Sequence, residues 1–224
     1  MFMNKTAHHL NTKYIFDSSS EQGIGDTPLH YAVYKGNVGA ARYLISNGAD
    51  VHALNSASVT GLHAACVFGN FKMAKFLLEN GANVNASCNC LTPLDVAASS
   101  GNLDLVKYLL SADADIKATS DACGKFYTTP LHMAAFAPNL SMLEYLLDDG
   151  AYFGVKNSEG KTLLHAAAER GNSCLVQYLI NKGANLNSSD RYKKTPLNLA
   201  AEGGHLDVVG LLYEMVSSRD FRED

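Results

Sequence analysis

Apolar and polar positions follow the same pattern in six consecutive blocks of the chain. Each block opens with a Thr-x-Leu sequence, and the steps between the opening threonines are 33, 32, 37, 33 and 33 residues. The six opening residues are Thr27, Thr60, Thr92, Thr129, Thr162 and Thr195. Self-similarity at a fixed period of this length indicates a repeat array, in which each block is one structural unit that stacks on its neighbours.

Each block predicts a pair of helices. The first helix is short and begins at the threonine, whose hydroxyl is suited to an N-cap, often with proline next, as in Thr27-Pro28. The second helix carries apolar residues at i, i+2, i+3, i+6 and i+7, as in 103–110, and stops at a Gly-Ala pair. In the first five blocks this stop lies 21 residues after the threonine. The variable part is therefore the loop that leads to the next threonine, which we call a finger.

These features resemble the ankyrin-repeat family. The resemblance rests on Thr27-Pro28-Leu29-His30 and its counterparts, the Ala-Ala pair, the glycine after it and the Gly-Ala-Asp/Asn ending, over residues 22–216. It implies an all-α-type repeat solenoid of six helix–loop–helix units with β-hairpin fingers. It also implies that fingers and first helices line a concave groove that binds a partner. We expect residues 1–21 to form a tail or irregular cap and residues 217–224 a charged tail.

Composition limits the function further. The chain has 47% hydrophobic and 18% charged residues, which is typical of a folded protein. Its net charge of −4 argues against a nucleic-acid partner, and it has no run of 18 apolar residues for a membrane span. The first residues do not read as a secretory signal, so we expect a cytoplasmic or nuclear protein with its five cysteines reduced. We expect a monomer that binds another protein.

No catalytic, nucleotide-binding or metal-binding motif stands out, so we predict neither an enzyme nor a cofactor. Four histidines, His30, His63, His132 and His165, share one position of the block, where the family uses the imidazole to link neighbouring units. Cys66 and Cys174 are expected to be core residues. The main prediction is a non-catalytic protein–protein interaction module. Two alternatives remain: a targeting or regulatory subunit of an enzyme complex, and a zinc- or redox-linked module that uses the finger cysteines Cys88, Cys90 and Cys123.

The resemblance places the binding surface on the two residues after each Ala-Ala pair and on nearby finger residues. Other blocks carry Ser99, Ser100 or Glu169 at these positions, so a large apolar residue there is not required for folding. The candidate contact residues are Tyr34, Lys35, Val59, Val67, Phe68, Leu91, Phe126, Tyr127, Phe136, Arg170, Tyr192 and Lys194. An aromatic stripe on the second helices is expected to pack between repeats.

Two further expectations concern the ends of the second helices. In the third block Asp113 replaces the helix-ending glycine, and the finger that follows, 119–128, is longer than the others. We therefore expect the junction of the third and fourth repeats to be the weakest of the array. By resemblance to other ankyrin fingers, Asn85 and Asn187 are candidates for asparaginyl hydroxylation.

Overall fold

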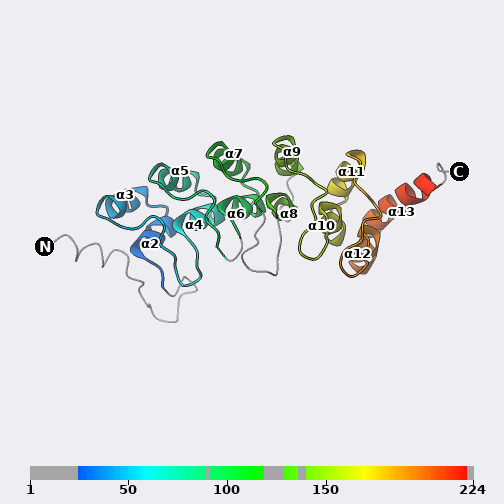
Figure 1. Cartoon of the computed structure of the whole chain (residues 1–224), viewed down its shortest axis with the longest axis horizontal. Coiled ribbons are helices and arrows are strands. Elements are labelled where there is room, and N and C mark those ends of the chain that lie inside the picture. Colours follow the sequence, from blue (N-terminus) through cyan, green and yellow to red (C-terminus); the bar gives the residue numbers. More distant parts are fainter. Residues whose placement is uncertain (1–24, 89–90, 119–128, 136–139, 221–224) are drawn as a thin grey trace. The chain divides into compact units, whose positions relative to one another are not determined.

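The computed structural model describes residues 25–88, 91–118, 129–135 and 140–220. Over these residues the chain forms twelve α-helices in six pairs, one pair for each predicted block (Figure 1). The pairs are α2 (Pro28–Tyr34) with α3 (Val38–Ser46), α4 (Gly61–Val67) with α5 (Phe71–Glu79), α6 (Pro93–Ser99) with α7 (Leu103–Ser111), α8 (Pro130–Ala134) with α9 (Leu140–Asp148), α10 (Leu163–Glu169) with α11 (Ser173–Asn181), and α12 (Pro196–Glu202) with α13 (Leu206–Asp220). The expected helical repeat array is confirmed.

Each first helix begins at the opening threonine of its repeat. In α4 the Thr60 Oγ1 accepts a hydrogen bond from the His63 backbone N–H at 3.3 Å, which satisfies one of the free N–H groups of the first turn. The helix is followed by a glycine with positive φ, such as Gly69 at +61°. An L-residue is strained in this left-handed conformation, so glycine sets where the chain turns back into the second helix.

Among the described residues, an asparagine is the N-cap of four second helices, α3, α5, α7 and α11. The Oδ1 of Asn70, for example, accepts from the Met73 N–H at 3.1 Å. Asparagine is among the best N-cap residues because its side chain reaches this donor. The helices stop at a left-handed residue, which is glycine at positions 48, 81, 150 and 183 and Asp113 in the third repeat, with φ +64°. The predicted helix stops, including the unusual one, are confirmed.

The chain divides into two compact bodies, residues 1–115 and 116–224. In the N-terminal body the first helices α2, α4 and α6 pack in one row and the second helices α3, α5 and α7 in another (Figure 1). Its core lies between the rows, where Leu62, Leu77 and Leu94 are at most 1% exposed. In the C-terminal body α10 packs between α8 and α12, and α11 packs against α13. Small residues such as Ala167 and Ala168, both fully buried, let these helices approach closely.

The fingers differ from the expected β-hairpins. Among the described residues they contain only isolated antiparallel bridges, Leu54 with Thr60 and Cys88 with Leu91, and no strand ladder. Three fingers are instead shaped by a side chain five residues before the threonine. The Oδ1 of Asn55 accepts from the N–H groups of Ala57 and Val59, and Asn157 and Asp190 do the same in their fingers. Turns of this kind need no cross-strand ladder.

The last helix departs from the others in length and exposure. α13 has 15 residues, against nine in the other second helices, and it continues through residues 217–220. Leu206 is 80% exposed and Tyr213 is 63% exposed, whereas the residue equivalent to Tyr213 in the fifth repeat, Ile180, is 4% exposed. Within the described residues no further repeat covers this face. No helix among the described residues is long and apolar enough to cross a membrane.

Candidate protein-binding face

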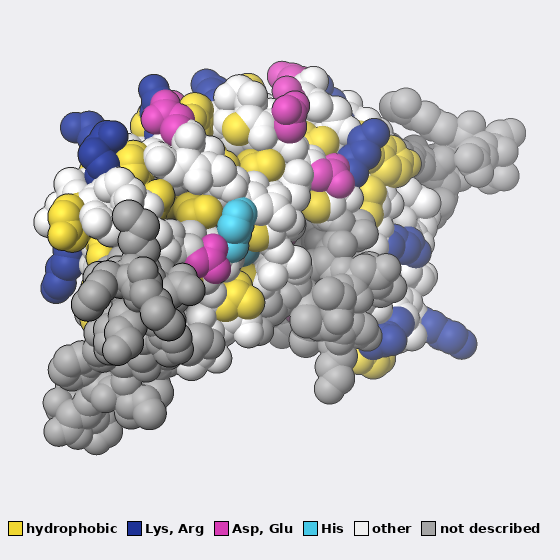
Figure 2. Space-filling view, turned by 60° about the vertical axis from the view of Figure 1, so that its left-hand side comes forward, with side chains coloured by type: hydrophobic (Ala, Val, Ile, Leu, Met, Phe, Trp, Pro, Cys, Tyr) yellow, Lys and Arg dark blue, Asp and Glu magenta, His cyan; other side chains and the backbone are white. Residues whose placement is uncertain are grey.

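The candidate face of the N-terminal body is formed by the ends of α2 and α4. Val67 is 55% exposed and Phe68 57% exposed, at the last residue of α4 and the residue after it. The same two positions of the third repeat are Ser99 and Ser100. Apolar side chains reach the molecular surface in patches on the side drawn in Figure 2.

Tyr34 joins this patch from α2. Its ring meets the Phe68 ring edge-on, with centroids 5.8 Å apart and planes at 69°, which is a favourable aromatic geometry. The Tyr34 hydroxyl donates to Asp26 Oδ1 at 2.9 Å, and the Asn55 amide donates to the same oxygen at 2.8 Å. Burial, followed by the hydrogen bond and charge of Asp26, raises the pKa of Tyr34 to about 12. Tyr34 is therefore half-buried and fixed in place rather than freely exposed.

The surroundings of the patch carry little charge. Val59 and Leu91, the predicted finger residues, are half-buried, and Lys35 beside Tyr34 is exposed. The two carboxylates nearest in sequence to α2 and α6, Asp26 and Asp95, are fully buried. The described part of this face is thus apolar with one exposed cation.

The predicted contact residues of the C-terminal body lie in a charged environment. The Lys161 Nζ bonds to both carboxylate oxygens of Glu169 at 3.0 Å, and Lys194 Nζ lies 2.7 Å from Glu202 Oε2. The hydrogen bond to Glu202 is the main cause of a raised Lys194 pKa. Arg170 is exposed, and Tyr192 is 63% exposed with the Arg191 guanidinium 5.9 Å from its ring centre. The predicted contact residues of the N-terminal body are thus mostly apolar, and those of the C-terminal body lie among charged side chains.

The repeated histidines have the predicted linking role. His63 Nδ1 lies 2.7 Å from its own Thr60 Oγ1, and Nε2 lies 3.1 Å from the Leu91 carbonyl oxygen at the start of the next repeat. His30 reaches the Val59 carbonyl and His165 the Lys194 carbonyl in the same way. Burial lowers the pKa of His63, His132 and His165, which favours the neutral ring. The rings of His30, His63 and His165 thus link each repeat to the next.

Two repeats depart from this link. His132 Nε2 is buried and has no hydrogen-bond partner in the described part of the chain, although the backbone of Lys161, at the equivalent position, acts to raise its pKa. In the third repeat Asp95 replaces histidine. Its Oδ2 accepts from the Thr92 N–H and hydroxyl, while Oδ1 is buried without a partner. Burial raises the pKa of Asp95 to about 6.

The cysteines do not form a metal site among the residues described. Cys66 and Cys88 are buried, and burial raises the pKa of both thiols, that of Cys66 to about 12. No group of three or more potential metal ligands occurs in the described ranges, and Cys90 and Cys123 lie outside them. The expectation that Cys174 is a core residue is wrong. It is exposed at the second position of α11, because the inward-facing positions of that helix begin with Leu175.

The two candidate asparagines differ in their contacts. The Asn85 amide donates to the Asp113 carbonyl at 3.0 Å, and its Oδ1 accepts from the Asp115 N–H at 2.8 Å. Asn187 is exposed, and its backbone N–H donates to Asn185 Oδ1. The Asn85 side chain thus has a structural role between successive turns. The predicted contact residues Phe126, Tyr127 and Phe136 lie outside the described residues.

Sequence reasoning missed one feature, a groove on the second-helix side of the N-terminal body. Phe71, Asp104, Lys107 and Tyr108 line it, together with Gly69, Asn102 and Ser111, around a depression of about 640 Å³. The four-residue spacing of Asp104 and Tyr108, which places them on one helix face, is a signal that could have drawn attention to it.

Comparison with known proteins agrees with the repeat architecture. A family model described as ankyrin repeats in three copies matches residues 48–120 and 131–220, a model for many copies matches 94–147, and a single-repeat model matches 24–56. The chain therefore belongs to the ankyrin-repeat family. Domains of this family are generally non-catalytic modules that bind proteins.

Two solved structures illustrate the similarity. The human ASB11 ankyrin repeat domain is 30% identical, with a TM-score of 0.73 and coverage of 84% of this chain and 83% of that one. The second match comes from a complex of the Bd0816 predatory endopeptidase of Bdellovibrio bacteriovorus with the immunity protein Bd3460. It is 26% identical, with a TM-score of 0.74 and coverage of 84% of this chain and 98% of that one. No curated protein matches the sequence.

Proposed function

We propose that the protein is a non-catalytic recognition module that binds a partner protein through Tyr34, Val67 and Phe68. The observation that carries the proposal is the exposure of Val67 and Phe68, 55% and 57%, at positions where the third repeat has serine. Folding does not require apolar residues there, and large apolar groups left on a surface commonly mark an interface. Lys35, Val59 and Leu91 form the border of the proposed contact.

The rigidity of Tyr34 supports this assignment. Its hydrogen bond to Asp26 and its edge-on contact with Phe68 fix the ring before any partner arrives. A preorganised aromatic group loses little side-chain entropy on binding, which is a property of interface hot spots. Phe126, Tyr127 and Phe136 lie outside the described residues and stay contact residues predicted from the sequence alone. In the C-terminal body, Arg170, Tyr192 and Lys194 would offer polar contacts to a partner.

The proposal is tested by capturing partners with the full chain and comparing the Phe68→Ala variant. We expect loss of one specific partner, with a binding affinity at least about tenfold weaker and an almost unchanged melting temperature. Tyr43→Ala is the matched control, because Tyr43 is 68% exposed but lies on a second helix. The proposal fails if Phe68→Ala unfolds the protein, or if both variants retain wild-type affinity for every partner.

A second candidate function within protein binding is inhibition of an enzyme. It is favoured by one observation, the similarity to a structure in which an immunity protein is in complex with an endopeptidase. This function would be supported by a captured partner whose peptidase activity is inhibited by the wild-type chain but not by the Phe68→Ala variant. A captured partner whose activity is unchanged by the bound chain would favour targeting or scaffolding instead.

A further inference from the structure

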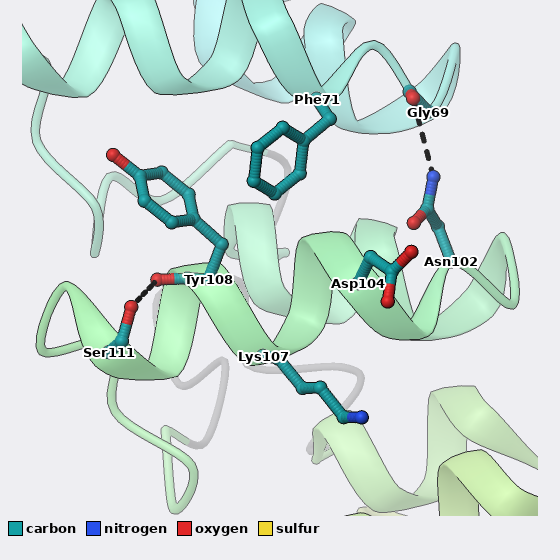
Figure 3. A pocket seen from close by; sticks show the side chains of 7 residues that line it. All are labelled: Gly69, Phe71, Asn102, Asp104, Lys107, Tyr108 and Ser111. Atoms are coloured by element: carbon teal, nitrogen blue, oxygen red, sulfur yellow. Dashed lines mark hydrogen bonds between the residues drawn. The ribbon is translucent and has the colours of Figure 1, made fainter.

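The groove between α5 and α7 combines two aromatic rings with a carboxylate. Phe71 is the first residue of α5, and its ring faces that of Tyr108 on α7, with centroids 5.1 Å apart and planes at 57° (Figure 3). Phe71 is 38% exposed and Tyr108 is half-buried. Asp104 lies one helical turn before Tyr108 on the same face of α7 and is exposed. Lys107 points away from the two rings (Figure 3).

In two other second helices a cation lies over the aromatic ring at the position equivalent to Tyr108. The sixth residue of α5 is Phe76, and the Arg42 guanidinium carbon lies 5.0 Å from the centre of its ring. The sixth residue of α11 is Tyr178, and the Lys182 Nζ lies 5.5 Å from its ring centre. Cations are attracted to the negative face of an aromatic ring at such distances. At two equivalent positions the chain thus supplies its own cation.

Tyr108, the sixth residue of α7, has no such cation among the described residues. The residue of α5 equivalent to Arg42 is Lys75, whose Nζ lies 3.9 Å from Glu79 instead. The second residue of α7 is Asp104, where α5 has Lys72 and α11 has Cys174. Within the described residues Asp104 makes no ion pair. The groove therefore offers two aromatic rings without a covering cation, and on the same helix a carboxylate that makes no ion pair, both within the described part of the chain.

We propose that this groove binds the guanidinium group of an arginine side chain from a partner protein. The planar guanidinium lies against the exposed side of the Tyr108–Phe71 ring pair, and its N–H groups donate to the Asp104 carboxylate. Arginine suits the groove better than lysine because its charged group is flat and presents paired donors to a carboxylate. The site lies on the second-helix side and does not depend on the first-helix face proposed above.

The probe is N-acetyl-arginine N-methylamide, titrated into the isotopically labelled full chain and followed by NMR. We expect saturable shifts at Phe71, Asp104 and Tyr108 with a Kd on the order of 1–10 mM. The norleucine analogue, which lacks the charge, should leave these signals in place. Asp104→Asn should weaken binding at least about fivefold, and Tyr108→Leu should abolish it. Tyr108→Phe, which keeps the ring, should retain wild-type affinity.

Asp207→Asn is the matched control, because Asp207 is likewise the second residue of its helix, α13, but faces no aromatic pair. It should leave the Kd unchanged. The proposal is overturned if the arginine probe gives no saturable shift at the three residues. It is also overturned if the norleucine analogue binds as well, or if Asp104→Asn and Asp207→Asn have equal effects.

Discussion

The Nζ of Lys161 lies 3.0 Å from both carboxylate oxygens of Glu169, eight residues further along the chain. The same spacing joins a finger to the end of a first helix elsewhere. In the sixth repeat it is the pair Lys194 and Glu202, and in the first it is Asp26 and Tyr34. In the second repeat the residues at these two positions are Val59 and Val67, which carry no charge. One eight-residue relationship thus recurs with different chemistry, a hydroxyl–carboxylate hydrogen bond in the first repeat and ion pairs in the fifth and sixth.

The Lys161–Glu169 ion pair should contribute modestly to stability. The Lys161 side chain is only 15% exposed, Glu169 is 49% exposed, and Lys161 also contacts Glu159. We expect a coupling energy of up to about 1 kcal/mol in a double-mutant cycle of Lys161→Met and Glu169→Gln. The cycle is measured by urea unfolding, and raising the salt concentration should reduce the coupling. The more exposed pair Lys194–Glu202 should give a smaller value; equal values for the two pairs would contradict the prediction.

Gly171 should be less replaceable than Gly183, although both have positive φ, +68° and +82°. A Cβ on Gly171 would lie 2.5 Å from His205 Nδ1, whereas one on Gly183 would meet nothing within 4 Å. We expect Gly183→Ala to cost about 1 kcal/mol of unfolding free energy, and Gly171→Ala at least about 1 kcal/mol more. The additional loss arises because His205 must leave its 3.1 Å contact with the Glu169 carbonyl.

Chemical denaturation of both alanine variants tests this difference. In a His205→Ala background the two glycine substitutions should become equally costly, because the obstructing ring is gone. A persistent difference in that background would show that His205 is not the cause.

Asp113→Gly should stabilise the protein by up to about 1 kcal/mol. Asp113 adopts φ +64°, where a Cβ is strained, and its negative charge stands at the C-terminus of α7, where the helix dipole disfavours it. Asp113→Asn separates the two effects, because it removes the charge and keeps the Cβ. If the asparagine variant is as stable as the glycine variant in thermal or urea unfolding, charge rather than backbone strain accounts for the gain.

Asp95 should make stability fall as pH rises from 3.8 to about 6. Its native pKa of about 6 lies above the ordinary 3.8, so the native state binds more protons than the unfolded state in this window. Above pH 6 the buried carboxylate must be ionised, which costs free energy. Asp95→Asn should remove this dependence and raise the stability at pH 7 by about 1 kcal/mol.

The sixth repeat shows that an amide fits this position, since Asn198 Oδ1 accepts from the Thr195 N–H and hydroxyl. The unfolding free energy is measured from pH 4 to pH 8 for the wild type and Asp95→Asn, with the exposed Asp148→Asn as control. Parallel curves for wild type and Asp95→Asn would refute the prediction. The neutral histidines His63 and His165 act in the opposite direction, because their lowered pKa values favour folding above their ordinary pKa of 6.5.

Much of the fold follows from local residues, and that part could be predicted. The opening threonines fixed the first helices, and even the non-glycine stop at Asp113 could be located from its spacing. The conformation of the finger turns could not be predicted. Ser58 and Lys193 adopt positive φ although they are not glycine, and the equivalent residue of the fifth repeat is Gly160. Those conformations depend on the side chains of Asn55 and Asp190 capping the turn, which periodicity does not reveal.

The candidate site was predictable only in part. Val67 and Phe68 stood out because equivalent positions carry serine, but the hydrogen bonds around Tyr34 include Asn55, which lies 21 residues further along the chain. The groove at Tyr108 was missed for a similar reason. An aromatic stripe looks uniform in the sequence, and only the structure distinguishes the rings covered by Arg42 and Lys182 from that of Tyr108, which has no such cation among the described residues.

The exposed face of α13 has a consequence for how such an array grows. Leu206 and Tyr213 are exposed on α13, and Ala201 is exposed where its counterpart Ala168 is fully buried in the fifth repeat. This face retains the residue types that a neighbouring repeat covers elsewhere. A further repeat stacked on this face would cover these apolar side chains, as successive repeats do in the rest of the array. The face of α13 is thus chemically matched to another ankyrin repeat, from this protein or from a second molecule.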